Sequence, residues 1–194
     1  MNKFDRNFWK ERYKDHNTGW DVGHASTPIQ KYIEQLTDKE LSILIPGCGN
    51  GYEAELLHKL GFKNVYLLDI VKQPLNNFSK RVPSFSKDHL INANFFEHKG
   101  KYDLIIEQTF FCALNPILRK DYVKQMRNLL AKKGKLIGLL FDFPLTEQGP
   151  PFGGSKQEYI NRFTKYFNLN VLEKAYNSIE SRQGKELFVI FEAD

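Results

Sequence analysis

The stretch Leu41-Ser-Ile-Leu-Ile-Pro-Gly-Cys-Gly-Asn-Gly51 begins as a short apolar run and breaks into three alternating glycines. A second apolar run begins at Val65 and ends in Asp69. A strand, a glycine turn, a helix and a second strand ending in an acid are typical of one half of a nucleoside-binding α/β sheet. The glycines let the backbone pass close to a ligand, and the Asp69 carboxylate can accept hydrogen bonds from two ribose hydroxyls. We therefore predict a nucleoside site at this turn.

The spacing of the glycines separates two kinds of nucleoside ligand. Dinucleotide sites space their glycines as G-x-G-x-x-G, whereas Gly47, Gly49 and Gly51 alternate with single residues. Together with Asp69 and an antiparallel hairpin expected at the C-terminus, this tighter spacing favours S-adenosylmethionine, which carries no phosphate. The same spacing disfavours an NAD-dependent oxidoreductase. A turn in which the glycines only supply positive φ is the plainer alternative.

Apolar periodicity along the rest of the chain predicts alternating strands and helices. Residues 1–38, which hold both tryptophans, are expected as helices or loops laid before the sheet. The expected strands lie at 41–45, 64–68, 89–92, 102–107 and 135–143, the helices at 51–60, 74–80, 116–132 and 155–166, and a final antiparallel hairpin pairs 169–174 with 186–192. This order predicts a three-layer α/β sandwich in a single domain.

The composition limits which partners the protein is expected to bind and in which cellular compartment it is expected. The net charge of +5 is mild, and the basic residues between Arg119 and Lys135 alternate with apolar ones at helical spacing, which indicates a solvated helix face rather than a nucleic-acid footprint. Two cysteines, an N-terminus unlike a signal peptide and no long apolar run predict a cytoplasmic protein without membrane contact, as a monomer or weak dimer. The five histidines lack ligand spacing, so no metal is expected.

Four motifs occur in order along nearly the whole chain. They are Phe8-Trp-Lys-Glu-Arg-Tyr13 with Thr18-Gly-Trp-Asp-Val-Gly23, Ile45-Pro-Gly-Cys-Gly-Asn-Gly51, Tyr102-Asp-Leu-Ile105 with Thr109-Phe-Phe-Cys-Ala-Leu-Asn-Pro116, and Gly149-Pro-Pro-Phe152. This set resembles the thiopurine S-methyltransferase family, and most of all its plant and bacterial branch of halide and thiol methyltransferases. The resemblance implies a class I methyltransferase fold, which is Rossmann-like, with a seven-stranded, mostly parallel sheet in the order 3-2-1-4-5-7-6. It also implies S-adenosylmethionine as cofactor and S-adenosylhomocysteine as product.

The resemblance further implies roles for individual positions. Residues 1–38 would form a lid and 39–194 the catalytic sheet and helices of one domain, 1–194. The positions implied to contact the cofactor are Trp9, Tyr13, Trp20, Gly47, Cys48, Gly49, Gly51, Asp69, Ile70, Asn94, Phe95 and Gln108. Two departures stand out: Ile45 occupies the place of a common acid before the first glycine, which leaves open how the methionine amino group is held, and Asn94 replaces an acid on the adenine side.

The expected chemistry is methyl transfer by in-line displacement, in which much of the work is alignment. The substrate-side candidates are Phe110, Phe111 and Phe152, and the resemblance adds Arg119, for which a surface charge is the alternative. Asp142 is ambiguous between meeting substrate and solvating a strand end. No His, Lys or acid stands out as a general base, and Cys48 and Cys112 read as fillers. Halides and thiolates need no base, whereas hydroxyl groups do. We therefore expect a small soft acceptor: a thiol, a thiopurine-like compound or a halide ion.

Other functions stay open on the sequence alone. A nucleic-acid or protein methyltransferase is weakened because Glu107-Gln-Thr-Phe110 follows the fourth strand where amino-methylating enzymes of DNA carry an Asn/Asp-Pro-Pro-aromatic motif. The remaining alternatives are a methyltransferase for a small hydroxyl or amine acceptor and a non-catalytic protein that binds S-adenosylmethionine or another nucleoside. For the lid, Trp9 and Trp20 would exclude water and offer π faces near positive charge; core packing is the alternative.

Overall fold

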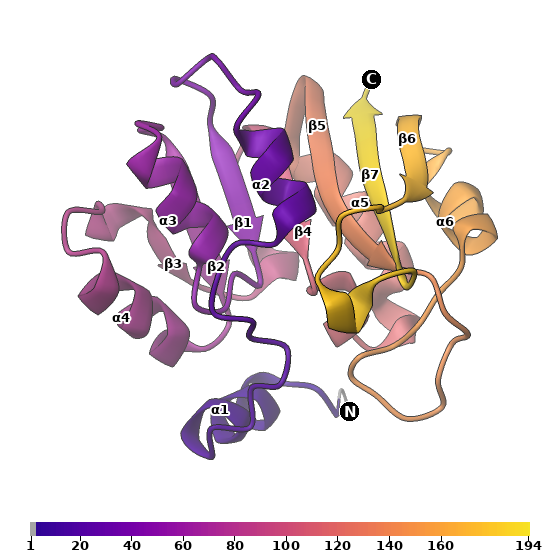
Figure 1. Ribbon diagram of the computed structural model, residues 1–194, viewed down its shortest axis with the longest axis horizontal. Coiled ribbons are helices and arrows are strands. Elements are labelled where there is room, and N and C mark those ends of the chain that lie inside the picture. Colours follow the sequence, from indigo (N-terminus) through magenta and orange to yellow (C-terminus); the bar gives the residue numbers. More distant parts are fainter. Residues whose placement is uncertain (1–2) are drawn as a thin grey trace.

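Seven strands form one sheet in the order β3-β2-β1-β4-β5-β7-β6 in the computed structural model, which describes residues 3–194 (Figure 1). The strands are β1 (Ile43–Pro46), β2 (Val65–Asp69), β3 (Leu90–Asn92), β4 (Tyr102–Gln108), β5 (Leu130–Phe141), β6 (Phe167–Lys174) and β7 (Glu186–Ala193). The pairs from β3 to β5 are parallel, and β7 runs antiparallel to both β5 and β6. The predicted α/β class, strand order and terminal hairpin are confirmed.

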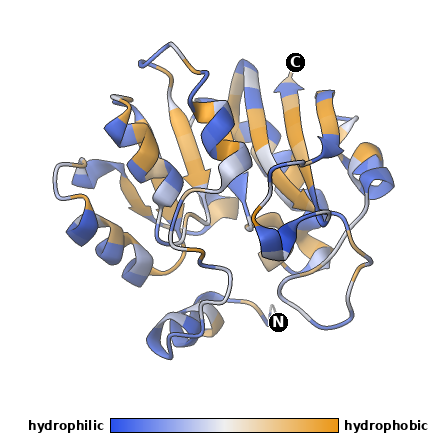
Figure 2. Cartoon of the chain, viewed as in Figure 1, coloured by the Kyte–Doolittle hydropathy of each residue, from blue (hydrophilic) through white to orange (hydrophobic). Residues whose placement is uncertain are grey.

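Helices cover both faces of the sheet and make a three-layer sandwich. The helices are α1 (Arg6–Lys14), α2 (Thr27–Ile33), α3 (Tyr52–Lys59), α4 (Lys72–Arg81), α5 (Arg119–Leu129) and α6 (Lys156–Phe163). Apolar side chains of α2, α3 and α4 pack in one buried cluster, and those of α5 and α6 pack in a second cluster on the opposite face. Hydrophobic residues therefore fill the strands and the inward helix faces, while the outward helix faces are hydrophilic (Figure 2).

Helix α5 shows how the pattern produces the packing. Tyr122, Val123, Met126 and Leu129 are buried at helical spacing, and the lysines between them point to solvent. Lys120 and Lys124 thus lie on a solvated helix face, as predicted. The rest of the basic stretch differs from the prediction, because Arg119 is buried and the lysines from Lys132 to Lys135 belong to β5.

The end of α5 differs from the prediction of a helix over 116–132. A short 3₁₀ turn (Pro116–Leu118) precedes the helix, which ends at Leu129, and Leu130 already lies in β5 opposite Tyr102. The register shifts after that pair, where Lys133 adopts a φ of 63° before Gly134. Both Leu129 and Leu130 are buried, so helical periodicity continues across the boundary although the backbone changes.

The N-terminal segment divides into two parts. Ile29 and Ile33 of α2 are fully buried against the sheet, so this helix belongs to one of the two covering layers. Helix α1 instead lies below the carboxyl ends of β1, β2 and β4, apart from the layers (Figure 1). Only the part before α2 is therefore placed where a lid would be. None of the helices among the described residues has the length and apolarity to cross a bilayer.

Candidate functional site

A cavity of about 1090 Å³ opens at the carboxyl ends of β1, β2 and β4 and is bordered by the segment that carries α1. Strand order reverses between β1 and β4, because β1 pairs with β2 on one side and with β4 on the other. In open α/β sheets, ligands bind outside the carboxyl ends of the strands at this switch point. The volume lies at the upper end of the roughly 300–1,000 Å³ of small-molecule sites, so a nucleoside and a second small molecule fit together.

The glycine turn after β1 forms part of the cavity wall. Gly47 has a φ of 57°, and a Cβ added there would overlap the Phe110 ring, so only glycine allows this close approach. Gly49 lies against the Tyr13 hydroxyl, with 3.3 Å between that oxygen and an added Cβ. The turn between β1 and α3 is thus narrow and presents backbone to the cavity.

Asp69 ends β2 beside this turn and is 7% exposed. Its Oδ2 accepts a hydrogen bond from the Gly49 N–H at 3.1 Å, and its Oδ1 accepts one from the Val71 N–H at 2.8 Å. Burial raises the pKa of Asp69 to about 6, although the backbone N–H groups oppose that rise. A carboxylate has about four lone-pair sites, so each oxygen can accept a further hydrogen bond from a ligand.

Three aromatic side chains of the N-terminal segment form a cluster beside the cavity. The Trp20 ring lies 5.4 Å from that of Trp9 and 5.7 Å from that of Tyr13, edge to face in both pairs. The Tyr13 hydroxyl is hydrogen-bonded to Trp20, and burial raises its pKa. All three line the cavity. The cluster thus packs α1 against the loop that follows it.

The far end of the cavity lies between β3, β4 and α5. Phe95 is buried there, and its carbonyl accepts a hydrogen bond from the Gln125 side chain at 2.9 Å. The Asn94 side chain is occupied: its Oδ1 accepts from the Phe96 N–H at 3.1 Å and its Nδ2 donates to Glu97 at 2.9 Å. Asn94 lines the cavity, but its amide caps the following 3₁₀ turn, a use that the sequence reasoning did not foresee.

Glu107 and Gln108 at the end of β4 have contrasting surroundings. One Glu107 oxygen accepts hydrogen bonds from the N–H groups of Phe110 (2.7 Å) and Phe111 (2.9 Å), and the other accepts one from the Tyr122 hydroxyl. Gln108 lines the cavity, and its buried Oε1 has no hydrogen-bond partner within the described residues. Buried polar atoms are almost always paired, so the unpaired Gln108 oxygen is an exception, and it lies in a residue of the cavity wall.

The structure brings together nearly all of the positions implied to contact a cofactor. Every one of them lines the cavity except Gly51. A Cβ at Gly51 would lie 2.6 Å from Leu67 and 2.9 Å from Phe78, and its φ is 70°. Gly51 therefore serves close packing of α3 on the sheet, and the expectation that it contacts the ligand is corrected.

Among the substrate-side candidates, only Phe110 lines the cavity. Phe111 is 2% exposed and packs on Tyr122 with a centroid distance of 4.9 Å. Phe152 is 5% exposed and packs edge to face on Phe4, while its N–H donates to the Cys112 carbonyl at 2.8 Å. These two phenylalanines are therefore packing residues, whereas their neighbours Phe110 and Pro151 line the cavity.

Arg119 and Asp142 also lie away from the cavity. Arg119 is fully buried and pairs with Glu158 at 2.9 Å, so it is neither a cavity residue nor a surface charge. Asp142 pairs with Lys174 at 2.6 Å. Protein partners satisfy both charges. Arg119 is therefore corrected as a substrate-side candidate, and Asp142, which the sequence left ambiguous, lies outside the cavity lining.

Besides Asp69, seven charged residues among those described line the cavity, and sequence reasoning selected none of them: Asp5, Arg12, Asp21, Glu53, Asp121, Lys124 and Arg182. Asp21 accepts hydrogen bonds from Asn50 and, at 3.4 Å, from the Tyr52 hydroxyl. Contacts between distant segments bring these charged residues to the cavity, so the sequence does not reveal most of them. Glu53 is an exception, because it follows Gly51 by two residues and its nearness to the glycine turn could have indicated a place in the cavity wall.

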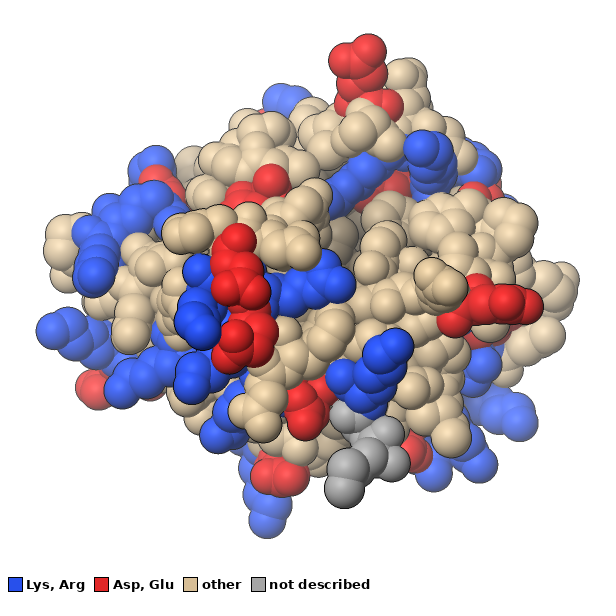
Figure 3. Space-filling model, turned by 90° about the horizontal axis from the view of Figure 1, so that it is seen from below, with Lys and Arg blue, Asp and Glu red and all other residues tan. Residues whose placement is uncertain are grey.

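The charges around the cavity do not suggest a polyanion or a metal. On the face that carries α1, basic and acidic side chains are interspersed and no patch of one sign dominates (Figure 3). Among residues 3–194, no group of three or more His, Cys, Asp or Glu side chains is arranged to hold a metal ion.

Comparison with known proteins identifies the family. The sequence profile of the family named thiopurine S-methyltransferase matches residues 4–193. The chain belongs to this family. It is a methyltransferase that depends on S-adenosylmethionine, as the resemblance implied.

Relatives within the family act on several sulfur compounds. The chain is 31% identical to a probable thiol methyltransferase 2 of Arabidopsis thaliana over 78% of this chain and 69% of that protein. It is 29% identical to a thiocyanate methyltransferase 1 of Brassica oleracea, over 92% and 81% of the two chains. A thiopurine S-methyltransferase of Vibrio vulnificus is 23% identical over 82% and 81%.

Solved structures share the fold. A 1,6-didemethyltoxoflavin-N1-methyltransferase of Burkholderia thailandensis, with its substrate and S-adenosylhomocysteine bound, superposes with a TM-score of 0.80 at 15% identity, covering 97% of this chain and 86% of that one. A TehB-like S-adenosylmethionine-dependent methyltransferase of Corynebacterium glutamicum gives a TM-score of 0.68 at 13% identity, covering 97% and 98%. At these identities the likeness concerns the fold alone.

Proposed function

We propose that this methyltransferase moves a methyl group from S-adenosylmethionine to a small sulfur nucleophile or another soft anion, such as a thiolate, thiocyanate or a halide. The observation that carries the choice of acceptor is the part of the wall formed by Phe110, Cys112, Phe141, Pro150 and Pro151, which is apolar and contains no His, Lys, Asp or Glu. The alternatives are a hydroxyl or amine acceptor and a protein that only binds the nucleoside.

The cavity residues suit the proposed cofactor. Asp69 has lone pairs left for two ribose hydroxyls, and the Gln108 oxygen needs a donor. The turn at Gly47 offers backbone at close range. When bound, S-adenosylmethionine supplies an electrophilic methyl group on a sulfonium, which a nucleophile takes by in-line displacement.

The two titratable groups nearest this apolar part of the wall, Glu107 and Cys112, are poor proton acceptors. Glu107 does not line the cavity, and its two oxygens accept three hydrogen bonds from Phe110, Phe111 and Tyr122. Burial raises the pKa of the Cys112 thiol, which keeps it neutral. An acceptor that already carries a negative charge, or loses its proton in water, therefore fits this site better than an alcohol.

The same wall strips water from the acceptor. Phe141 and the two prolines remove hydration from a soft anion, and the Arg182 guanidinium lies 5.9 Å from the Phe141 ring centroid within the cavity lining. Desolvation and a nearby positive charge both favour a small anion held in line with the methyl group.

The proposal is tested by measuring S-adenosylhomocysteine formation with a panel of thiols, thiocyanate, iodide, phenols and amines. We expect turnover with thiols, thiocyanate or iodide to exceed turnover with phenols and amines at least tenfold. Faster methylation of phenols or amines would contradict the acceptor class, and cofactor binding without turnover on any acceptor would favour a binding protein.

Two controls accompany this panel. The rate without protein is subtracted, because thiolates react slowly with sulfonium compounds unaided. The variant Asp69→Ala should lose turnover with every acceptor through weaker cofactor binding, whereas Asp38→Ala, an exposed change before β1, should match the unaltered protein.

A further inference from the structure

One buried carboxylate of the cavity wall has no role in the function described so far. Glu53 is the second residue of α3, is 6% exposed and lines the cavity. It accepts a hydrogen bond from the Ser26 N–H at 3.1 Å and another from its own backbone N–H. A buried charge is costly unless it is paired. An ionised Glu53 carboxylate would therefore need a cationic partner.

The described residues supply no cation in contact with Glu53. Arg182 and His24 influence it electrostatically, but neither forms an ion pair with it. The Arg182 guanidinium is held elsewhere: it donates to the Trp20 carbonyl at 2.9 Å and pairs with Glu186 at 3.6 Å. Burial accordingly raises the pKa of Glu53. A cationic ligand group would complete the surroundings of this carboxylate.

The end of β1 supplies no acid to the cavity. Most class I methyltransferases carry an acid two residues before the first glycine, and Ile45, 2% exposed, stands there in this chain. Glu53 follows the same glycine turn on the next element, two residues after Gly51, and faces the same cavity. In this chain, the first turn of α3 rather than the end of β1 thus presents a carboxylate to the cavity.

We infer that Glu53 binds the ammonium group of the methionine moiety of S-adenosylmethionine and of its product. This inference rests on the proposed function, because it assigns one contact within that cofactor site. It makes Glu53 a recognition residue for the amino acid end of the ligand, distinct from Asp69 at the ribose.

The test measures binding by calorimetry with three ligands. S-Adenosylmethionine and S-adenosylhomocysteine both carry the ammonium, and only the first carries the sulfonium; 5′-deoxy-5′-methylthioadenosine carries neither. The variant Glu53→Gln keeps an oxygen that can accept from Ser26 N–H and removes the charge. We expect it to weaken binding of the first two ligands about 10- to 100-fold, the range of a charge-assisted hydrogen bond, and to leave the third within twofold.

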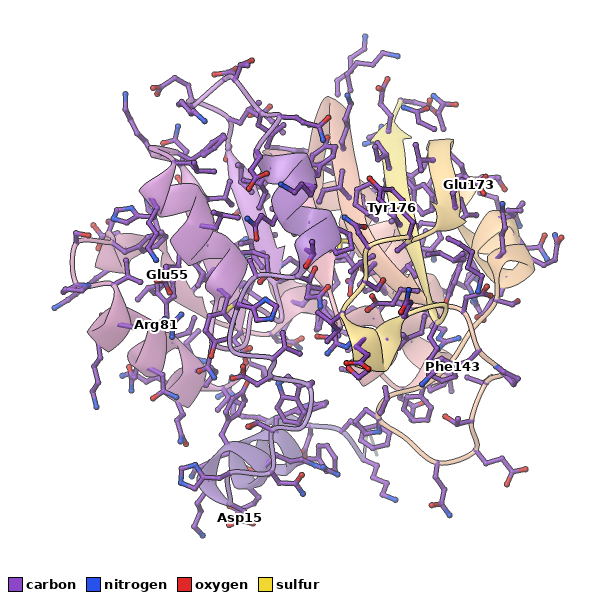
Figure 4. All side chains as sticks on the ribbon, viewed as in Figure 1. Asp15, Glu55, Arg81, Phe143, Glu173 and Tyr176 are labelled. Carbon is purple, nitrogen blue, oxygen red and sulfur yellow. The ribbon has the colours of Figure 1, made fainter. Side chains whose placement is uncertain are left out.

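The matched control is Glu55→Gln on the same helix. Glu55 pairs with Arg81 at 2.6 Å on the outside of α3 and α4, where both side chains are labelled in Figure 4, and it does not line the cavity. This variant should bind all three ligands as the unaltered protein does.

A second measurement keeps the test decisive if Glu53→Gln folds poorly. The unaltered protein is titrated with the S-adenosylhomocysteine analogue in which hydrogen replaces the amino group, and we expect 10- to 100-fold weaker binding than for S-adenosylhomocysteine. In a folded variant, this difference between the two ligands should largely disappear.

Each other result has a definite meaning. Weaker binding of S-adenosylmethionine alone would place Glu53 at the sulfonium and overturn the inference. Equal loss for all three ligands, or no loss, would also overturn it, as would equal affinity of the unaltered protein for the deaminated analogue. If the unaltered protein binds neither S-adenosylmethionine nor its product, the proposed function itself fails.

Discussion

At the scale of single residues, Arg119 shows how a buried charge holds a loop beside the site. Its Nη1 donates to both oxygens of Glu158 at 3.0 and 2.9 Å, and its Nη2 donates to the Gly153 carbonyl at 2.7 Å. The guanidinium also stacks over the Phe111 ring at 4.7 Å. One side chain thereby joins the start of α5, helix α6 and the loop that carries Pro150 and Pro151.

We predict that Arg119→Met lowers stability without removing the cofactor site. Glu158 is partly exposed and keeps its ion pair with Arg162, so the main loss is the hydrogen bond to the buried Gly153 carbonyl. Leaving that carbonyl unpaired costs about 1–3 kcal/mol, which corresponds to a fall of roughly 2–12 °C in melting temperature for a chain of this size. Calorimetric affinity for S-adenosylhomocysteine should change less than threefold. The control is Arg127→Met on the exposed side of the same helix. A loss of affinity at unchanged melting temperature would return Arg119 to the ligand site.

At the scale of elements, the segment before α2 meets the rest of the protein through separate hydrogen bonds and ring contacts, such as the bonds that Asp21 accepts from Asn50 and Tyr52. Gln73 of α4 donates to the Tyr13 carbonyl at 3.4 Å, and Arg182 donates to the Trp20 carbonyl at 2.9 Å. The aromatic cluster of Trp9, Tyr13 and Trp20 faces the cavity rather than the core beneath the sheet. Such an element can open while the sheet stays folded.

We predict that Trp20→Ala weakens binding of S-adenosylhomocysteine at least tenfold and lowers the melting temperature by no more than a few degrees. The reason is that Trp20 covers the cavity and its ring is only partly buried against Trp9 and Tyr13. Tyr176→Ala is the matched control, because that side chain is 88% exposed on the loop before β7 (Figure 4). A large fall in melting temperature with unchanged affinity would make Trp20 a packing residue.

Helices and strands could be predicted from the sequence where the hydrophobic periodicity matches the secondary structure that forms. The two strands around the glycine turn, the hairpin at the end and the amphipathic face of α5 follow from periodicity alone. The boundary at Leu130 did not, since a buried leucine suits a helix and a strand equally. Helix α2 was not separated from the lid, because its burial arises only when the sheet is present to receive Ile29 and Ile33.

The sequence likewise predicts one part of the candidate site and not the other. Local geometry places Gly47, Gly49 and Asp69 at one sheet edge, so sequence could predict that part. The neighbours Phe110 and Phe111 could not be told apart, because the hydrogen bonds of both N–H groups to Glu107 fix which ring turns to the cavity. Contacts between distant segments decide such positions, and a single sequence does not display them.

At the scale of the whole molecule, several carboxyl groups are buried around the cavity and the sheet. Burial raises the pKa of Asp69 to about 6 and that of Glu107 to about 7, and it also raises the pKa values of Glu53 and Glu186. A carboxyl whose pKa is higher in the folded state binds its proton more tightly there. Its contribution to stability is complete below its ordinary value, near 4, and is lost as the pH rises through 6 to 7.

Glu107→Gln isolates one of these groups. The amide oxygen can accept from the N–H groups of Phe110 and Phe111, and the amide nitrogen can donate to the Tyr122 hydroxyl, so the variant keeps the contacts without the titration. We predict that between pH 5 and pH 8 the unfolding free energy of the unaltered protein falls relative to the variant, by up to about 3 kcal/mol. Urea unfolding at four pH values measures this difference, with Glu147→Gln on the exposed loop after β5 as control. If the unfolding free energies of the variant and the unaltered protein change in parallel with pH, Glu107 keeps one protonation state across the range. Its hydrogen bonds alone would then account for its contribution to stability.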